Sequence, residues 1–325
     1  MVIKMKEYGG YLEWEYYGGK EYHAAYRVDS VRSALAYTIN QRGYSKIYIP
    51  FYLCQCIKDL ISKLGIEYKY YSINNRFLPI IVDRIKETEC IFLVNFFGQL
   101  NEKDIYIIKN KGNVFLDNTH CFFEKNSYGI DMANSCRKFF GLPDGGYFYT
   151  NLSMKEYDSY DYDISFNKMI PNLGRFEMGS TKFYKEFQIN DSLERGIPCK
   201  KMSNLVKNIL KSLDYEMIIK KRKSNFNIVN NTLKNINLLR IKNEGGLFLY
   251  PLLVNNGKII KQKLILNKIY VPTFWPSVEK LVDDKSFERK LYDDLVLLPI
   301  DQRYDEKDME IILERVSKAI KEVNS

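Results

Sequence analysis

The sequence has few of the residues that build metal centres and disulfide frameworks. Only two histidines, His23 and His120, occur in 325 residues, and they are too isolated for a metal cluster. The spacing of the six cysteines is not that of a disulfide framework. Neither a second pair of cysteines nor a nearby histidine completes a zinc site with Cys54 and Cys56. We therefore expect no metal, and free thiols in a reducing compartment.

Long apolar segments are also missing. No apolar run approaches the roughly 20 residues that span a bilayer, and the N-terminal stretch MVIKMKEYGGYLEWEYY has no apolar core of the signal-peptide kind. We therefore expect a cytoplasmic protein without a membrane partner. Hydrophobic residues make up 46% and charged residues 27% of the chain, which is typical of a folded globular protein.

The net charge of +9 does not by itself indicate a nucleic-acid partner. The basic residues are spread along the chain, with only short clusters such as residues 220–223. We expect no nucleic acid, although a modestly basic protein would suit a phosphorylated substrate.

The first half of the chain alternates between strand and helix patterns, as in an open α/β sheet. We expect helices over residues 28–42, with Asp29 or Ser30 as the N-cap, and over residues 54–65, closed by Gly65. Strands are expected at residues 46–50, 67–73, 90–98, 113–117 and 145–151.

The pattern changes after about residue 155. A polar, loop-rich stretch leads to a long helical pattern over roughly residues 203–233. Strands are then predicted at residues 245–254 and 268–272, before an amphipathic helix at residues 306–323. We therefore predict a large domain over residues 1–210 and a smaller α+β domain over residues 211–325.

The region from Val114 to Tyr149 holds the residues most suited to chemistry. Asp117 ends a predicted strand, and the carboxyl edge of an open α/β sheet is where ligands bind. Lys138 follows a short strand and precedes the turn LPDGG, among aromatic residues that could desolvate its amine as a Schiff-base lysine requires. From this spacing alone, a surface lysine would be the more ordinary interpretation of Lys138.

The sequence DNTH (117–120), followed by SCRKFFGLPDGG (135–146), resembles the cofactor region of the DegT–DnrJ family. Its members are pyridoxal-phosphate (PLP) aminotransferases that act on nucleotide-linked keto-sugars. In that family an aspartate and a Gln or His precede a strand, and a Gly-Gly pair begins seven residues after the Schiff-base lysine. Asp117, His120, Lys138 and Gly145 stand at those positions.

The resemblance covers nearly the whole chain. DSVRSALAYTI is similar to the family's phosphate-binding turn and helix, with Val31-Arg32 in place of Gly-Thr, and IYIPFYLCQCI resembles the strand and loop beneath the cofactor. It implies a fold-type I PLP-dependent transferase, with a mixed, mostly parallel sheet flanked by helices. The branch resembled is a short one with an RK-x5-DGG core.

The resemblance also implies a role for each cofactor residue. Lys138 would carry PLP as a Schiff base and move the proton, and Asp117 would pair with the pyridine nitrogen. His120 would lie near the ring or its phenolic oxygen. From the residues alone, Asp117 could instead cap the following turn, and His120 could be a buried, hydrogen-bonded histidine.

The cofactor phosphate would be held at the start of a helix. Ser30, Ser135 and the backbone of Val31 and Arg32 are the expected contacts, because free N–H groups and the helix dipole favour an anion there. The Arg32 side chain could add a charge-assisted contact. Tyr52 or Phe51 could stack on the ring, although core packing is as good an interpretation of either.

The sequence departs from the family at three positions. The family serine usually lies five residues before the lysine, where this chain has Ala133, and Ser135 is only three before it. Cys54 stands where an aromatic residue is common. Cys199 stands where an asparagine reaches the phosphate of the neighbouring subunit.

The function implied is transfer of an amino group, from glutamate, to a nucleotide-linked keto-sugar in the synthesis of a surface polysaccharide or glycoconjugate. The partners would be a nucleotide sugar, an amino-acid donor and a second copy of the chain, with the aromatic arm Tyr8–Tyr17 in the homodimer contact. Alternatives are a sugar dehydratase, which Lys138 disfavours because such relatives carry histidine there, and a non-enzymatic regulatory partner.

Overall fold

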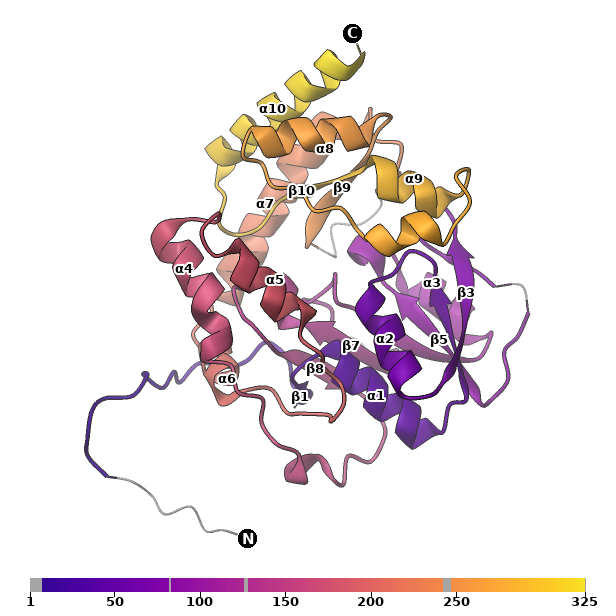
Figure 1. Cartoon of the computed structure of the whole chain (residues 1–325), viewed down its shortest axis with the longest axis vertical. Helices are drawn as coiled ribbons and strands as arrows, with labels where there is room; N and C mark the ends of the chain where they lie inside the picture. The colour runs from indigo at the N-terminus through magenta and orange to yellow at the C-terminus, as the bar shows by residue number, and fades with distance from the viewer. Residues whose placement is uncertain (1–7, 82, 126–127, 242–246, 325) are drawn as a thin grey trace.

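An eight-stranded mixed sheet forms the centre of the protein. The structure, a computed structural model, describes residues 8–81, 83–125, 128–241 and 247–324 (Figure 1). The strand order is β1-β8-β7-β6-β5-β2-β3-β4, and the inner run β7-β6-β5-β2-β3 is parallel. The strands are β1 (Tyr26–Val28), β2 (Lys46–Pro50), β3 (Glu67–Ile73), β4 (Pro79–Ile80), β5 (Glu89–Val94), β6 (Asn113–Asp117), β7 (Asp131–Ser135) and β8 (Gly146–Tyr149).

Two short antiparallel strands, β9 (Leu249–Leu253) and β10 (Leu295–Pro299), form a second sheet. The helices are α1 (Val31–Arg42), α2 (Gln55–Lys63), α3 (Glu102–Lys109), α4 (Ile170–Met178), α5 (Tyr184–Ser192), α6 (Asn204–Leu210), α7 (Tyr215–Leu233), α8 (Gly257–Leu266), α9 (Phe287–Asp294) and α10 (Glu306–Asn324). Helices α7, α8 and α10 surround the second sheet at one end of the molecule (Figure 1). The predicted fold class is therefore confirmed, while the domain boundary at residue 210 stays a prediction.

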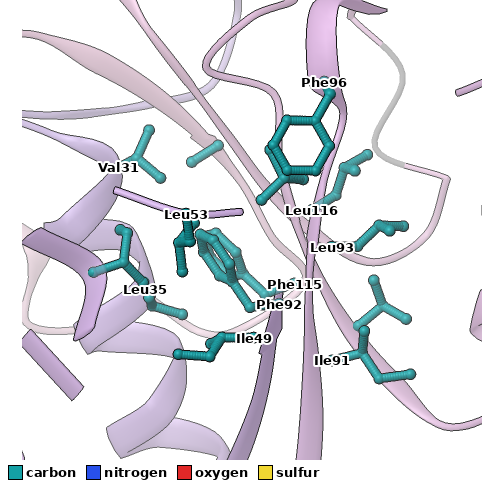
Figure 2. Close-up of a cluster of buried hydrophobic side chains, with 14 of the residues drawn as sticks. Val31, Leu35, Ile49, Leu53, Ile91, Phe92, Leu93, Phe96, Phe115 and Leu116 are labelled. Atoms are coloured by element: carbon teal, nitrogen blue, oxygen red, sulfur yellow. The ribbon is translucent and has the colours of Figure 1, made fainter. Parts of the chain in front are cut away.

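Apolar side chains from α1 pack on the central parallel strands. Figure 2 shows Val31 and Leu35 of α1 facing residues of β2, β5 and β6, with the rings of Phe92 and Phe115 side by side. These two rings are stacked, with centroids 5.8 Å apart. β5 is buried along its whole length, as expected for an inner strand of a parallel sheet covered on both faces. This core holds in place the carboxyl ends of the parallel strands, where the candidate site lies.

Most predicted elements are present, and the largest differences lie in the second half. The predicted strand at residues 268–272 was wrong: Ile269 and Val271 are buried in the core around β9 and β10, but the segment pairs with no described strand. These apolar side chains contribute to the core, and the backbone of the segment does not form a strand. The predicted strand at residues 245–254 is β9, although residues 245–246 lie outside the described residues.

The single helix predicted over residues 203–233 is two helices, α6 and α7. Asp214 separates them because its carboxylate accepts a hydrogen bond from the N–H of Met217 and starts α7 as an N-cap. The polar stretch after residue 155, expected to be rich in loops, contains α4 and α5. Within the four described ranges, no helix has the length and apolarity to cross a membrane.

Candidate active site

A small cavity lies at the carboxyl edge of the parallel strands. Its volume is about 130 Å³, and its lining includes Ser30, Val31, Arg32, Asp117, His120, Ser135 and Lys138. All seven were predicted from the sequence, and they come from three chain segments that the topology brings together: the start of α1, the end of β6 and the end of β7. This is the edge where open α/β sheets bind ligands.

Lys138 lies in a turn that directly follows β7. A single turn of 3₁₀-helix, Cys136–Lys138, leads into the loop that returns to β8, and the N–H of Cys136 donates to the carbonyl of Gly145 at 2.9 Å. Gly145 has a φ of +102°, and a Cβ there would lie 3.3 Å from the sulfur of Cys136. Among the described residues, the half-buried amine of Lys138 has no hydrogen-bond partner and is therefore available to a ligand.

Asp117 ends β6 as a buried carboxylate. One of its oxygens accepts a hydrogen bond of 2.8 Å from the N–H of Thr119, so the turn-capping interpretation of Asp117 holds alongside its place in the cavity. Burial raises its pKa to about 6, against the opposing effects of the Thr119 hydrogen bonds and the charge of Lys138. A cationic N–H donor in the cavity would stabilise the ionised form.

His120 is enclosed by aromatic rings. Its ring stacks on Phe248, Phe274 and Trp275, with centroid distances of 4.7, 5.8 and 6.3 Å. Burial, and then the charge of Lys138, lowers its pKa to about 3, so the imidazole is neutral near neutral pH. Its Nδ1 is buried without a hydrogen-bond partner in the described part of the chain. A bound ligand could satisfy that nitrogen.

The start of α1 offers backbone donors to the cavity. Ser30 is the N-cap, as predicted, and its hydroxyl accepts from the N–H of Ser33. The N–H groups of Val31 and Arg32 meet no acceptor within the described ranges. Free N–H groups at the first turn of a 12-residue helix are suited to an anion.

Two arginines and an aspartate complete the polar wall. Arg32 donates to the carbonyl of Leu193 at 3.2 Å, and Arg137 forms an ion pair of 2.6 Å with Asp191 of α5. Burial alone would raise the pKa of Asp191, but the charges of Lys138 and Arg137 hold it below its usual value. The lining therefore holds three cations, Arg32, Arg137 and Lys138, and two carboxyls, Asp117 and Asp191.

Sequence reasoning did not place Asp191, Phe274 or Trp275 in the site, although all three line the cavity. Asp191 comes from the polar stretch after residue 155 that was expected to be rich in loops. The only available signal for Trp275 was that the chain has just two tryptophans. Cys54 and Cys56 also line the cavity. In the sequence they stand out only as an incomplete zinc site, and Cys54 as a difference from the family.

Tyr52 is the one predicted site residue outside the cavity lining. Its side chain is fully buried, and its ring contacts Trp275 at a centroid distance of 4.9 Å. Phe51 stacks on Tyr70 instead. Cys199, at the position of the family asparagine, donates its thiol to the carbonyl of Ser33 in the same chain. The ring contact proposed for Tyr52 stays a prediction.

A larger, shallower hollow of about 390 Å³ includes residues from the amino ends of β6 and β7. Two of its cations already have partners: Arg42 bonds Asp131 at 2.9 Å, and Lys109 donates to the carbonyl of Tyr128. We place the candidate site in the smaller cavity, because the amine of Lys138 has no hydrogen-bond partner among the described residues and lies near the buried carboxyl of Asp117.

No protein-family model and no curated protein matches the sequence. Solved structures do match the fold. The PLP form of Spr1654 from Streptococcus pneumoniae is 14% identical, with a TM-score of 0.63, over 92% of this chain and 87% of that one.

PseC of Helicobacter pylori, an aminotransferase of pseudoaminic acid biosynthesis, is 16% identical, with a TM-score of 0.65, over 91% of this chain and 86% of its own. A DegT DnrJ EryC1 StrS aminotransferase from Brucella abortus is 14% identical, with a TM-score of 0.61, over 90% and 85%. The chain therefore has the fold of sugar aminotransferases of that family, as its motifs predicted.

Proposed function

We propose that this chain is a PLP-dependent aminotransferase that moves an amino group, from glutamate, onto a nucleotide-linked keto-sugar. The observation that carries the proposal is the meeting of Lys138, Asp117 and the start of α1 around one cavity. An amine, a buried carboxyl and an anion-binding helix terminus are the three groups that a phosphorylated pyridine aldehyde requires. The fold shared with sugar aminotransferases supports the same conclusion.

The cavity residues fit PLP by chemistry. Asp117, with its pKa raised to about 6 by burial, would gain a partner in the protonated ring nitrogen. The unpartnered Nδ1 of His120 would gain one in a polar ring substituent. The free N–H groups of Val31 and Arg32, with the hydroxyls of Ser30 and Ser135, would hold the phosphate.

Bound PLP supplies an electron sink for the bond-breaking at the substrate's amino-bearing carbon. The amine of Lys138 would anchor the cofactor and then carry the proton between the two carbon positions of the amino-group transfer. Asp117 would hold a proton on the ring nitrogen, so that the ring keeps its electron-withdrawing character. Phe274 and Trp275 would exclude water from this wall, since both are stacked on His120.

The substrate class follows from the fold neighbours and the charge of the site. PseC acts in the biosynthesis of pseudoaminic acid, which supports a sugar substrate here. The three cations of the lining outnumber its two carboxyls, and this excess of positive charge suits a phosphorylated sugar nucleotide. We propose that the product enters a surface polysaccharide or glycoconjugate and that the enzyme acts in the cytoplasm.

We also propose that the protein works as a homodimer. Helices α4 and α5 pack on each other and expose apolar side chains, among them Ile170, Leu173, Phe176 and Ile189. Phe176 is 89% exposed, and exposed apolar side chains on two packed helices are typical of a subunit contact. The arm Tyr8–Tyr17, which extends from the body in Figure 1, would join this contact.

The test is an absorption spectrum of the full chain after incubation with PLP. The wild type should show a visible band that borohydride fixes and glutamate bleaches, while Lys138→Ala should show no fixed band. Lys155→Ala, at an exposed lysine outside the cavity, is the control and should behave as the wild type. A wild type without a band would favour a non-enzymatic protein of the same fold.

A further inference from the structure

Two thiols meet in the wall of the cavity. The sulfur atoms of Cys54 and Cys56 lie 2.9 Å apart, well inside the about 3.5–4.0 Å of ordinary packed heavy atoms. Cys54 is the N-cap of α2, and Cys56 lies in its first turn. Both side chains are half-buried and line the same cavity as Lys138, so a small reagent that enters the cavity can reach them.

The two thiols differ in character. A hydrogen bond from Cys56, together with the charge of Lys138, lowers the pKa of Cys54 to about 7, although burial opposes this. The same hydrogen bond and burial raise the pKa of Cys56 far above its usual value. Cys54 is therefore the more acidic thiol of the pair, and the sulfur of Cys56 lies directly beside it.

The other four cysteines lack this arrangement. Cys90, Cys121 and Cys136 are buried, and burial raises the pKa of each thiol. Cys199 donates to the carbonyls of Ser33 and Gly196, and burial raises its pKa to about 11. None of these four lines the cavity. Oxidation should therefore select the pair at the start of α2.

We propose that Cys54 and Cys56 are a reversible modification site, oxidised to an intramolecular disulfide by a small-molecule disulfide such as oxidised glutathione. The Cys54 thiolate attacks one sulfur of the reagent, forming a mixed disulfide and releasing one glutathione thiolate. Cys56 then loses its proton to solvent and attacks the Cys54 sulfur, which releases the second glutathione. Counted from two neutral thiols, the protein loses two electrons and two protons, and the two released glutathione thiolates take up two protons from solvent.

The disulfide between Cys54 and Cys56 would also change the charge around Lys138. It removes the negative charge of the Cys54 thiolate from the neighbourhood of Lys138, so the protonated form of the nitrogen at Lys138 loses stabilisation. This consequence rests on the proposed PLP function, whereas formation of the disulfide does not. With PLP bound, the pH at which its band changes from the acidic to the basic form should fall on oxidation.

The first test is a mass map of the full-length protein after treatment with oxidised glutathione, alkylation of remaining thiols and trypsin digestion. The tryptic peptide at residues 47–58 holds both cysteines, while each other cysteine lies in a peptide of its own. We expect peptide 47–58 to lose two hydrogens and escape alkylation, and to recover both thiols after dithiothreitol. Full alkylation of this peptide, or a lasting glutathione adduct on it, would overturn the proposal.

Single variants then test the order of attack. Cys56→Ser should trap a glutathione adduct on Cys54, because no second thiol can displace it. Cys54→Ser should react more slowly, because burial still raises the pKa of the remaining Cys56 thiol. Cys199→Ser, outside the cavity, should form the disulfide as the wild type does. A faster adduct in Cys54→Ser than in Cys56→Ser would contradict the assignment of Cys54 as the attacking group.

The PLP-loaded protein gives a separate readout. A lower pH midpoint of the band in the oxidised form, restored by dithiothreitol and absent in Cys54→Ser, would support the coupling to Lys138. The same midpoint in both redox forms would overturn that coupling. A protein with the disulfide but no band in either form would refute the proposed cofactor and leave the modification site standing.

Discussion

Arg222 of α7 donates a hydrogen bond of 2.9 Å to the carbonyl of Phe139, the residue that follows Lys138. The same guanidinium donates to the carbonyl of Leu247 at 2.5 Å and to the side chain of Gln302 at 2.7 Å, and it is 1% exposed. Burial lowers its pKa to about 10, so it stays charged near neutral pH. One buried cation therefore ties the lysine turn to the C-terminal part of the chain.

Arg222→Met should destabilise the protein by about 3 kcal/mol, because the buried carbonyls of Phe139 and Leu247 would lose their charged donor. The free energy of unfolding, measured in urea, gives the comparison. Lys221→Met, one residue earlier and exposed, is the control and should change stability by less than about 0.5 kcal/mol. Equal stability of the two variants would mean that the guanidinium contacts contribute little.

Asp117→Asn should make the cofactor-free protein more stable above about pH 6. The native Asp117 carboxyl has a pKa raised from 3.8 to about 6, so the folded state holds a proton that the unfolded state has lost. Wild-type stability therefore falls as the pH rises through that window, and the asparagine removes the loss, which is at most about 3 kcal/mol.

Urea unfolding at about pH 4, 6 and 8 would measure this difference. Asp144 also has a pKa raised to about 6, so only the difference between the wild type and Asp117→Asn isolates Asp117. The same variant should bind PLP more weakly, because the ring nitrogen loses its carboxylate. Parallel stability profiles for the two proteins would show that Asp117 titrates normally.

Arg32→Leu should weaken PLP binding by about 10- to 100-fold, as expected for the loss of one charge-assisted contact. Binding of pyridoxal, which has no phosphate, should change little. Titration of both ligands against the wild type and the variant separates the two effects. Arg315→Leu on α10, far along the chain from the cavity lining, provides the charge-matched control. An equal loss for both ligands would point to general damage to the cavity.

Phe176→Asp should convert the proposed dimer to monomers. Phe176 is 89% exposed in the chain, so its replacement should leave the fold intact while placing a charge in the subunit contact. Sedimentation at micromolar concentration gives the oligomeric state. Leu266→Asp, on α8 and 83% exposed, is the matched control. A monomeric wild type would refute the dimer outright.

The local signals in the sequence predicted most of the first half of the fold, but not the edge strands β1 and β4. Ser30 before an apolar helical pattern predicted the N-cap of α1, and apolar runs predicted the inner strands. Asp117 was found because it ends a strand, which limits where its side chain can lie. Lys138 was found by its motif, since its spacing alone favoured a surface lysine. Backbone position and motif spacing were enough to gather seven of the eight predicted site residues around one cavity.

The remaining features depend on contacts between distant segments. Residues 268–272 have the composition of a strand. A strand forms only where a neighbouring strand is free to pair with it, and the local sequence pattern does not show whether such a strand exists. Nothing local places Trp275 or Asp191 beside Lys138, because both approach the cavity from separate helical or loop segments. The contact between the sulfurs of Cys54 and Cys56 likewise depends on how the chain enters α2.

Phe274 and Trp275 lie between α8 and α9, yet the other residues that line the cavity all come from the chain between Ser30 and Asp191. A ligand held there would touch both halves of the chain and act as a shared piece of their packing. Because the ligand binds only the folded state, its binding free energy would stabilise the second half of the chain as well as the first. Resistance to heat, proteolysis and hydrogen exchange would accordingly rise in α7 to α10 as well as around Lys138. The bound ligand would thus stabilise both halves of the chain together.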